Sequence, residues 1–432
     1  MRDLLIVAIV ASGCIVALRR PWIGVLLWTW LSIMNPHRYT YGFAYSTPLA
    51  AATVVATLLG LLFTKDKGSP FKGAPVTVLV LFMCWMTLTS IFGFDPVNNY
   101  PQWNKIMKID FMILIALALL CSKKHILALT AVSAGSVALL GAKGGIFTLM
   151  TAGSYKVWGP PGSFIEDNNE FALAAIITIP LLRFLQLQLP QRWLRNTMTA
   201  IIVLCAAAAI GSYSRGAFVA IIAMGATFWW NDGKKPGVLI GMFILGGATL
   251  MFMPEQWFAR MDTINNYQND DSAMGRINAW WMAWNLAKDQ FFGGGFDIYN
   301  LAIFSRYAPV PNDVHAAHSI YFQVLGEHGF IGLFLFLLLW WLVWREAGKL
   351  KKIGIGQTET RWLSELGAMC QVSLIGYAVG GAFLSLAYFD LPYNVMVMVV
   401  LASRWLDRKA WLEDIERPPV LGKPPLDGIA KA

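Results

Sequence analysis

The chain has 432 residues, of which 57% are hydrophobic and only 14% are charged, and its formal net charge at pH 7 is +9. Soluble globular domains carry about 25% charged residues, so this composition excludes the ordinary soluble class. The mean hydropathy of +0.54 points the same way. A basic chain can indicate a nucleic-acid partner, but here Lys and Arg lie in short connections between apolar runs. They therefore indicate membrane topology, and we expect no nucleic acid among the partners.

Continuous apolar runs follow one another from Leu4 to Trp405. Many have the roughly 20 residues that a helix needs to cross hydrocarbon, and they do not alternate with polar residues, so they predict helices. The predicted spans are residues 4–18, 21–35, 45–63, 76–94, 109–121, 125–141, 170–187, 197–211, 216–231, 236–253, 330–344, 364–386 and 391–405. We predict an all-α polytopic membrane protein with about 12 transmembrane helices; about 13 also fits, and the side of the N-terminus depends on that number.

Basic residues mark alternate connections. They run from Arg19 and Arg20, through the Arg345–Lys352 cluster, to the tail beyond Arg404, and they predict the cytoplasmic side. Arg19 directly follows the first apolar run without a small-residue cleavage site, so this run is expected to stay attached. The five cysteines lie in or beside apolar runs without paired spacing, which predicts neither a disulfide nor a metal site. The predicted outer connections are residues 36–44, 95–108, 142–169, 212–215, 254–329 and 387–390.

These signals divide the chain into four parts. Residues 1–253 hold the N-terminal transmembrane helices, residues 254–329 form one large outer loop, residues 330–405 hold the C-terminal transmembrane helices, and residues 406–432 form a cytoplasmic tail. Long connections in compact proteins are usually functional, so the large outer loop is the first place to look for a site.

The large outer loop contains a predicted helix with an aromatic face. Asp271 can cap its N-terminus, and Trp280, Trp281 and Trp284 follow. This face fits equally well a helix at the membrane boundary and a packed core. We expect Asp270 and Asp271 to serve solubility and capping rather than cation binding.

Four basic residues of the outer connections predict an anionic ligand. Arg276 lies in the first turn of the predicted helix, where a cation opposes the helix dipole unless an anion joins it. Arg215 lies in a very short turn between two apolar helices, a depth that requires an anionic partner or contact with lipid phosphates. Lys143 and Lys156 lie in another outer connection. Because arginine forks match phosphate oxygens, a lipid-linked phosphate or diphosphate fits both the charge and the depth.

A histidine cluster follows the glycine turn at Gly293–Gly295. His315 and His318 are three residues apart, a spacing that predicts a shared helix face, but zinc would need a third ligand with suitable spacing. Structural hydrogen bonding and acid-base chemistry remain as the two interpretations, since imidazole titrates near pH 6.5.

These motifs, in their order along the chain, resemble the O-antigen ligase and polymerase family, and within it the O-antigen ligases (WaaL type) with their exosortase-associated O-glycosylation ligase subgroup. The resemblance covers most of the chain. It is carried by Ser214-Arg215-Gly216, by Arg276 with Trp280 leading to Gly293-Gly294-Gly295-Phe296, and by Ala317-His318-Ser319 through Tyr321-Phe322-Gln323 to Gly329-Phe330-Ile331-Gly332. The subgroup is suggested by Arg19-Arg20-Pro21-Trp22 and Asn35-Pro36-His37-Arg38. Ser319 departs from the pattern, because many relatives have Asn after the histidine.

The resemblance implies a GT-C-like fold in the bacterial inner membrane, with residues 254–329 as a periplasmic loop. It implies metal-independent, inverting transfer of a glycan from undecaprenyl diphosphate to a sugar hydroxyl of lipid A-core oligosaccharide, without a cofactor and with membrane lipids around both partners. His318 would then be the general base, and two arginines would replace a metal by stabilising the diphosphate. The implied diphosphate-binding residues are Arg215, Arg276, Lys143 and Lys156, and the secondary candidates are His315 and Tyr321.

Three other functions use similar features. A repeat-unit polymerase would take a second lipid-linked glycan as acceptor, and a protein O-oligosaccharyltransferase would take a Ser or Thr hydroxyl. A lipid-linked oligosaccharide flippase belongs to another class. Transporters usually place charged residues near the bilayer midplane in paired halves, whereas the apolar runs here are nearly free of charge, which disfavours transport.

Overall fold

The computed structural model describes residues 2–231, 247, 251, 253–255, 257–258, 271–354 and 358–410. Most of the predicted span 236–253, much of the first part of the large outer loop with Asp270, and the tail from residue 411 lie outside the described residues. Every regular element in the described ranges is a helix, which confirms the predicted all-α class.

The α-helices, in chain order, are α1 (Arg2–Arg19), α2 (Pro21–Met34), α3 (Leu49–Phe63), α4 (Ala74–Phe92), α5 (Pro96–Leu119), α6 (Lys123–Met150), α7 (Asn168–Gln188), α8 (Arg192–Gly211), α9 (Arg215–Asn231), α12 (Asp271–Asp289), α13 (Leu301–Tyr307), α14 (Ile320–Ile353), α15 (Arg361–Gly381) and α16 (Asp390–Asp407). Short 3₁₀ helices are η1 (Pro36–Tyr39), η2 (Phe43–Tyr45) and η4 (Thr358–Thr360).

Five described helices are long and apolar enough to cross a membrane, namely α4, α6, α7, α8 and α14. The shorter apolar segments are α2, α3 and residues Arg215–Trp230 of α9. The chain is therefore a polytopic helical membrane protein. The number of 12 crossings stays a prediction.

Two helices extend into connections that we expected to be outer loops. α5 starts at Pro96 because the Asp95 carboxylate accepts a hydrogen bond from the Asn98 amide at 3.1 Å, and proline is tolerated in a first turn. α6 continues to Met150 and therefore includes Lys143. Hydropathy identifies the lipid-facing part of a helix, so it does not reveal polar or glycine-containing turns beyond that part.

The core is organised around α16, which contacts α5, α6, α14 and α15. Every residue from Asp390 to Ala402 is buried. The neighbouring helices contribute large side chains such as Phe82 and Phe336, whose rings lie 6.0 Å apart. This close packing gives the connections at both ends of the bundle fixed positions.

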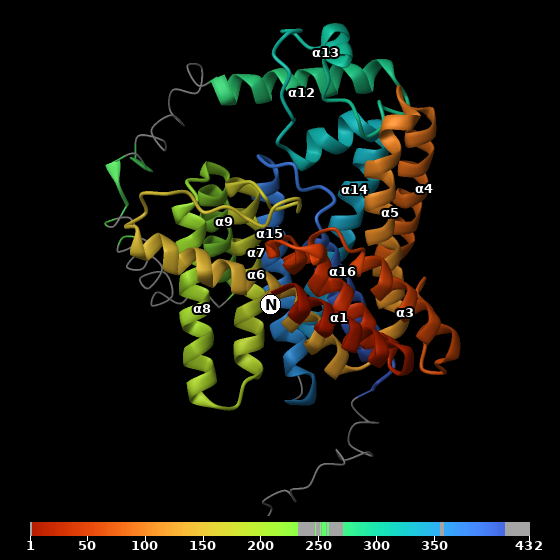
Figure 1. Ribbon diagram of the computed structural model, residues 1–432, viewed down its shortest axis with the longest axis vertical. Coiled ribbons are helices and arrows are strands. Elements are labelled where there is room, and N and C mark those ends of the chain that lie inside the picture. The colour runs from red at the N-terminus through yellow and green to blue at the C-terminus, as the bar shows by residue number, and fades with distance from the viewer. Residues whose placement is uncertain are drawn as a thin grey trace, which may run out of the picture.

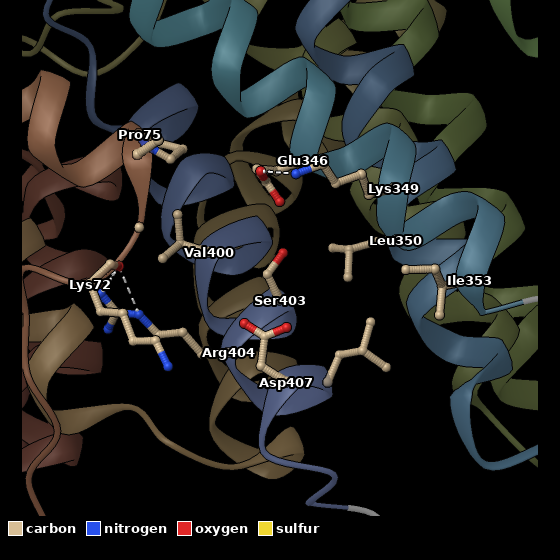
Figure 2. A pocket seen from close by; sticks show the side chains of 13 residues that line it. Lys72, Pro75, Glu346, Lys349, Leu350, Ile353, Val400, Ser403, Arg404 and Asp407 are labelled. Carbon is tan, nitrogen blue, oxygen red and sulfur yellow. Dashed lines mark hydrogen bonds and ion pairs between the residues drawn. The ribbon is translucent and has the colours of Figure 1, made fainter.

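One end of the bundle collects basic segments that we predicted to be cytoplasmic. The α3–α4 connection and the last turns of α14 and α16 enclose a cavity of about 340 Å³, where Lys349 pairs with Glu346 (Figure 2). The Arg404 guanidinium donates hydrogen bonds to the carbonyl oxygens of Lys72 and Leu117 at 3.1 and 2.9 Å. These segments thus lie on a common side, as the topology prediction requires.

The other end carries α12 and α13, and α12 lies across the bundle there (Figure 1). A glycine turn attaches this layer to α14. The amides of Gly294 and Gly295 each donate a 2.9 Å hydrogen bond, to the carbonyl oxygens of Gly326 and Glu327. The two backbones approach closely at this glycine turn, and α12 is thereby held against α14.

Gly295→Ala should destabilise the protein. Gly295 has a φ of 83°, and an added Cβ would lie 2.2 Å from the Asn99 side-chain nitrogen. Strain of this kind costs about 1–3 kcal/mol, so we expect a lower Tm in thermal unfolding of the detergent-purified protein. Gly135→Ala is the matched control, because its Cβ would meet nothing within 4 Å on α6 and helix propensity favours alanine there. Equal Tm values for the two variants would contradict the argument.

Candidate functional site

Arg215 is the first residue of α9 and follows a tight turn after α8. Tyr213 in that turn has a φ of 62°, and its hydroxyl donates a 2.6 Å hydrogen bond to the Gly153 carbonyl oxygen. The Ser214 hydroxyl accepts a hydrogen bond from the Ala217 amide at 3.3 Å and so caps α9. The turn holds the Arg215 backbone at the positive end of the α9 dipole, where an anion is favoured.

Arg215 and Arg276 border one cavity of about 270 Å³, which we call the arginine cavity. Both side chains are half-buried. The remaining lining is mostly apolar and comes from α9, α12 and the connection before α16; the full lining is Arg215, Gly216, Val219, Ala273, Arg276, Ile277, Trp280 and Phe383. Two guanidinium forks in such a hollow suit a phosphate-bearing ligand with an apolar neighbouring part.

The position of Arg276 on α12 differs from the prediction. α12 is described from Asp271, so Arg276 lies beyond its first turn. The dipole argument that we made for Arg276 therefore applies to Arg215 instead, since helix-terminal charge effects fall off within one turn.

Trp280 connects the arginine cavity to the histidine segment. Its indole N–H donates a 2.7 Å hydrogen bond to the Ala317 carbonyl oxygen, and its ring stacks on Phe322 at 5.0 Å between centroids. Trp281 and Trp284 of the same helix are instead 52% and 40% exposed. The aromatic face is thus divided between cavity lining and an exposed surface.

His318 directly follows Ala317 and approaches a buried carboxyl group on α7. Its Nδ1 lies 3.8 Å from Oε1 of Glu170, which is only 7% exposed. His318 has a φ of 42°, a left-handed conformation that non-glycine residues rarely adopt. Nδ1 of His318 and Oε2 of Glu170 are both buried without a hydrogen-bond partner. A small movement would convert this contact into a direct hydrogen bond, as catalytic groups often require in the absence of substrate.

Asp167 adds a second carboxyl group beside this pair. Burial opposes ionisation, but the contact with the Glu170 carboxyl and the hydrogen bonds from the Asn169 amide and side chain outweigh it and lower the pKa of Asp167. His318 lowers this pKa further. Asp167 also caps α7 by accepting a 2.8 Å hydrogen bond from the Asn169 amide.

Sequence reasoning missed Glu170. The residue stands in the first turn of a predicted span, where a glutamate is normally explained by the helix dipole. Its burial beside a histidine almost 150 positions later is a tertiary feature. The available signal was an acidic residue at the edge of an apolar run, where membrane burial makes charge costly.

The other predicted site residues lie outside the arginine cavity. Lys143 is exposed on α6, with Nζ 5.5 Å from the Tyr39 ring centroid, and Lys156 is exposed in the connection after α6. The Tyr321 hydroxyl donates a 2.7 Å hydrogen bond to the Ala378 carbonyl oxygen, which fixes α14 against α15.

His315 lies beside α12, next to the backbone that carries Arg276. Its Nε2 lies 2.8 Å from an Asp313 carboxylate oxygen, and its ring lies against Gly275, one residue before Arg276. A Cβ at Gly275 would approach His315 Cδ2 to 2.4 Å. His315 and His318 both precede α14, which begins only at Ile320, so the predicted shared helix face is wrong. The segment that holds the two histidines has no regular secondary structure.

The third histidine of this segment is structural. His328 is fully buried, and its Nδ1 lies 2.6 Å from the Thr89 hydroxyl. Its carbonyl oxygen accepts a 2.8 Å hydrogen bond from the Trp85 indole. Within the part of the chain that the structure describes, no three His, Cys, Asp or Glu side chains form a group suited to a metal ion.

Two segments of the chain match known protein families. Residues 1–189 match a family of unknown function, DUF5935. No curated protein matches the chain. Residues 200–337 match the family described as O-antigen ligase, a segment that contains Arg215, Arg276, Trp280 and His318. The function of this family is glycan transfer of the ligase or polymerase type. Residues 200–337 of this chain therefore form an O-antigen ligase family segment.

Proposed function

We propose that this protein transfers a glycan from undecaprenyl diphosphate to a sugar hydroxyl of lipid A-core oligosaccharide, on the periplasmic face of the inner membrane. The observation that supports this proposal most is the joint arrangement of Arg215 and Arg276 around one cavity whose Trp280 is bonded to the residue before His318. Diphosphate-binding groups and a candidate base thus occupy neighbouring positions.

In this proposal the two arginines bind the donor diphosphate. Each guanidinium can form paired hydrogen bonds to phosphate oxygens, and both strengthen as negative charge develops on the leaving diphosphate. This stabilisation takes the place that a metal ion has in other diphosphate chemistry, so the reaction is proposed to need neither metal nor cofactor. The apolar lining of the arginine cavity suits the first isoprene units of the donor.

His318 is the proposed general base. It removes the proton of the acceptor hydroxyl while that oxygen attacks the anomeric carbon from the side opposite the diphosphate, which inverts the configuration. The C1–O bond to the diphosphate breaks, and the proton remains on the imidazole. Glu170, beside Nδ1, is then a positioning residue that orients the ring and stabilises the imidazolium, with Nε2 directed to the acceptor.

Glu170→Gln should lower kcat about tenfold to a hundredfold, because removal of the carboxylate leaves the imidazolium without its compensating charge. Donor binding should be unchanged, since Glu170 lies outside the arginine cavity. Steady-state kinetics measure the expected loss in kcat, and separate donor-binding measurements test whether the donor affinity is unchanged. Glu170→Asp keeps the charge and should recover part of the rate; equal loss in both variants with weakened donor binding would show a purely structural role.

Reconstitution tests the function itself. The purified full chain in proteoliposomes receives labelled undecaprenyl-diphosphate glycan together with lipid A-core oligosaccharide, a second lipid-linked glycan, or a peptide rich in Ser and Thr. We expect label in lipid A-core product, unaffected by a chelator. Label confined to longer undecaprenyl-linked chains would assign a polymerase instead, and label on the peptide would assign a protein O-oligosaccharyltransferase.

A further inference from the structure

A second cavity, of about 400 Å³, lies between α2, η1, α5 and the connection before α7. We call it the η1–α5 cavity. Its lining is Trp28, Leu31, Ser32, Asn35, His37, Arg38, Ala50, Pro101, Asn104, Lys105, Lys108, Ile109, Gly162, Ser163 and Phe164. These residues all differ from those of the arginine cavity, so the two hollows are separate. Three connections predicted to face the same side of the membrane meet here.

The polar side of the η1–α5 cavity is strongly positive. Arg38, Lys105 and Lys108 line it, and none of its described lining residues is Asp or Glu. Burial, and then the neighbouring Arg38, lower the pKa of His37, so that imidazole is neutral near pH 7 and adds hydrogen-bonding capacity without charge. Three positive charges therefore face one hollow of small-molecule size.

Two carboxylates lie beside the lining of this cavity. Asp390, at the start of α16, accepts a hydrogen bond from the Ser32 hydroxyl and attracts Lys105 electrostatically. The Glu166 carboxylate accepts a 2.8 Å hydrogen bond from the Gly162 amide. In the described part of the chain, Arg38, Lys105 and Lys108 form no ion pair with a carboxylate. Three cations and no carboxylate in the lining itself leave the cavity surface positive.

Arg38 is held in place but incompletely bonded. Its guanidinium carbon lies 4.8 Å from the centroid of the Tyr45 ring, and its Nε lies 3.6 Å from where a Cβ on Gly162 would be. The same Nε is buried without a hydrogen-bond partner, as is Nδ1 of the adjacent His37. Buried donors are almost always bonded in proteins, so the charged Arg38 Nε–H at the edge of a cationic cavity favours an anionic ligand there.

Part of the lining is apolar. Trp28 and Leu31 belong to the last turns of the apolar helix α2, and Nζ of Lys105 lies 3.8 Å from the Phe164 ring centroid. A ligand that fills the cavity must therefore combine a negative group with an apolar part. That combination is found where a phosphate group joins a lipid.

We propose that the η1–α5 cavity binds a phosphate monoester, contributed by the headgroup of a membrane amphiphile. The phosphate oxygens accept hydrogen bonds from Arg38, Lys105 and Lys108, and the glycerol or first chain carbons contact Trp28 and Phe164. The site is separate from the proposed glycan transfer and can be measured without turnover.

The test uses the purified full chain in detergent and native mass spectrometry. The probes are dioctanoyl phosphatidic acid, dioctanoylglycerol with the same chains but no phosphate, and inorganic phosphate as competitor. We expect phosphatidic acid to bind at least about tenfold more tightly than dioctanoylglycerol, because charge-assisted hydrogen bonds to phosphate are lost in the latter. Inorganic phosphate should compete weakly, since it lacks the apolar part; affinity equal to that of phosphatidic acid would overturn the lipid assignment in favour of a free anion.

The variants Arg38→Gln and Lys108→Gln should each weaken phosphatidic acid binding about tenfold. Lys108 is exposed and lines the cavity, so Lys108→Gln should keep the parent fold. Tm and size-exclusion profiles check the folding of both variants. Arg192→Gln and Lys67→Gln, at exposed positions elsewhere, are the matched controls and should bind as the parent does. Parent-like binding by both cavity variants, or equal binding of phosphatidic acid and dioctanoylglycerol, would overturn the proposal.

Discussion

His318→Ala should lower kcat for glycan transfer by about 10²–10⁴-fold, the range expected for removal of the proposed general base. The donor should still bind, because the residues that line the arginine cavity are unchanged. Quenched-flow or end-point transfer assays with labelled donor measure the rate, and equilibrium binding with the same donor measures the affinity.

The choice of replacement matters because His318 has a φ of 42°. An alanine in this left-handed conformation is strained, whereas asparagine adopts it more readily. His318→Asn is therefore the better control for folding, since it removes the base and keeps the backbone. We expect both variants to be inactive and His318→Asn to keep the parent Tm. A transfer rate of His318→Asn equal to that of the parent protein would show that His318 is not the general base.

Arg215→Ala and Arg276→Ala should each lower kcat/KM for the donor by about 10²–10³-fold. In the proposed reaction, each change removes one guanidinium that stabilises the negative charge developing on the diphosphate. Arg→Lys at either position keeps the charge without the fork and should recover part of the activity. If both side chains bind one diphosphate, the double alanine variant should lose less than the product of the two single losses.

The matched control for these variants is Arg192→Ala, since Arg192 is an exposed arginine at the start of α8 and outside both cavities. It should keep parent-like donor kinetics. Unchanged donor kinetics in both Arg215→Ala and Arg276→Ala would instead indicate that these arginines contact only lipid headgroups.

Much of the fold could be predicted because the bilayer imposes a strong pattern on sequence. Continuous apolar runs identified the helices from α1 to α9 and from α14 to α16, since lipid permits few other backbone arrangements. The lengths of α5 and α6 could not be predicted in the same way. Their outer turns are fixed by local capping at Asp95 and by packing, to which hydropathy is insensitive.

The site was only partly predictable. Arg215, Arg276 and His318 could be selected because charge is rare beside apolar runs and therefore conspicuous. Their arrangement depends on tertiary contacts such as the Trp280 hydrogen bond to Ala317, and no spacing encodes it. Glu170 remained unnoticed for the same reason, since its meaning comes from the approach of His318.

The break in α14 at Gly329, where φ is 67°, bears on the depth of the proposed chemistry. Residues 330–353 alone give about 36 Å of helix, more than the roughly 30 Å of hydrocarbon. If these residues cross the membrane, the segment from Ile320 to His328 lies in the interfacial layer, and His318 with it. Water is abundant at that depth and would compete with the acceptor hydroxyl for the activated sugar. In the proposed reaction, the ratio of transferred to hydrolysed glycan would then measure how well the bound acceptor excludes water.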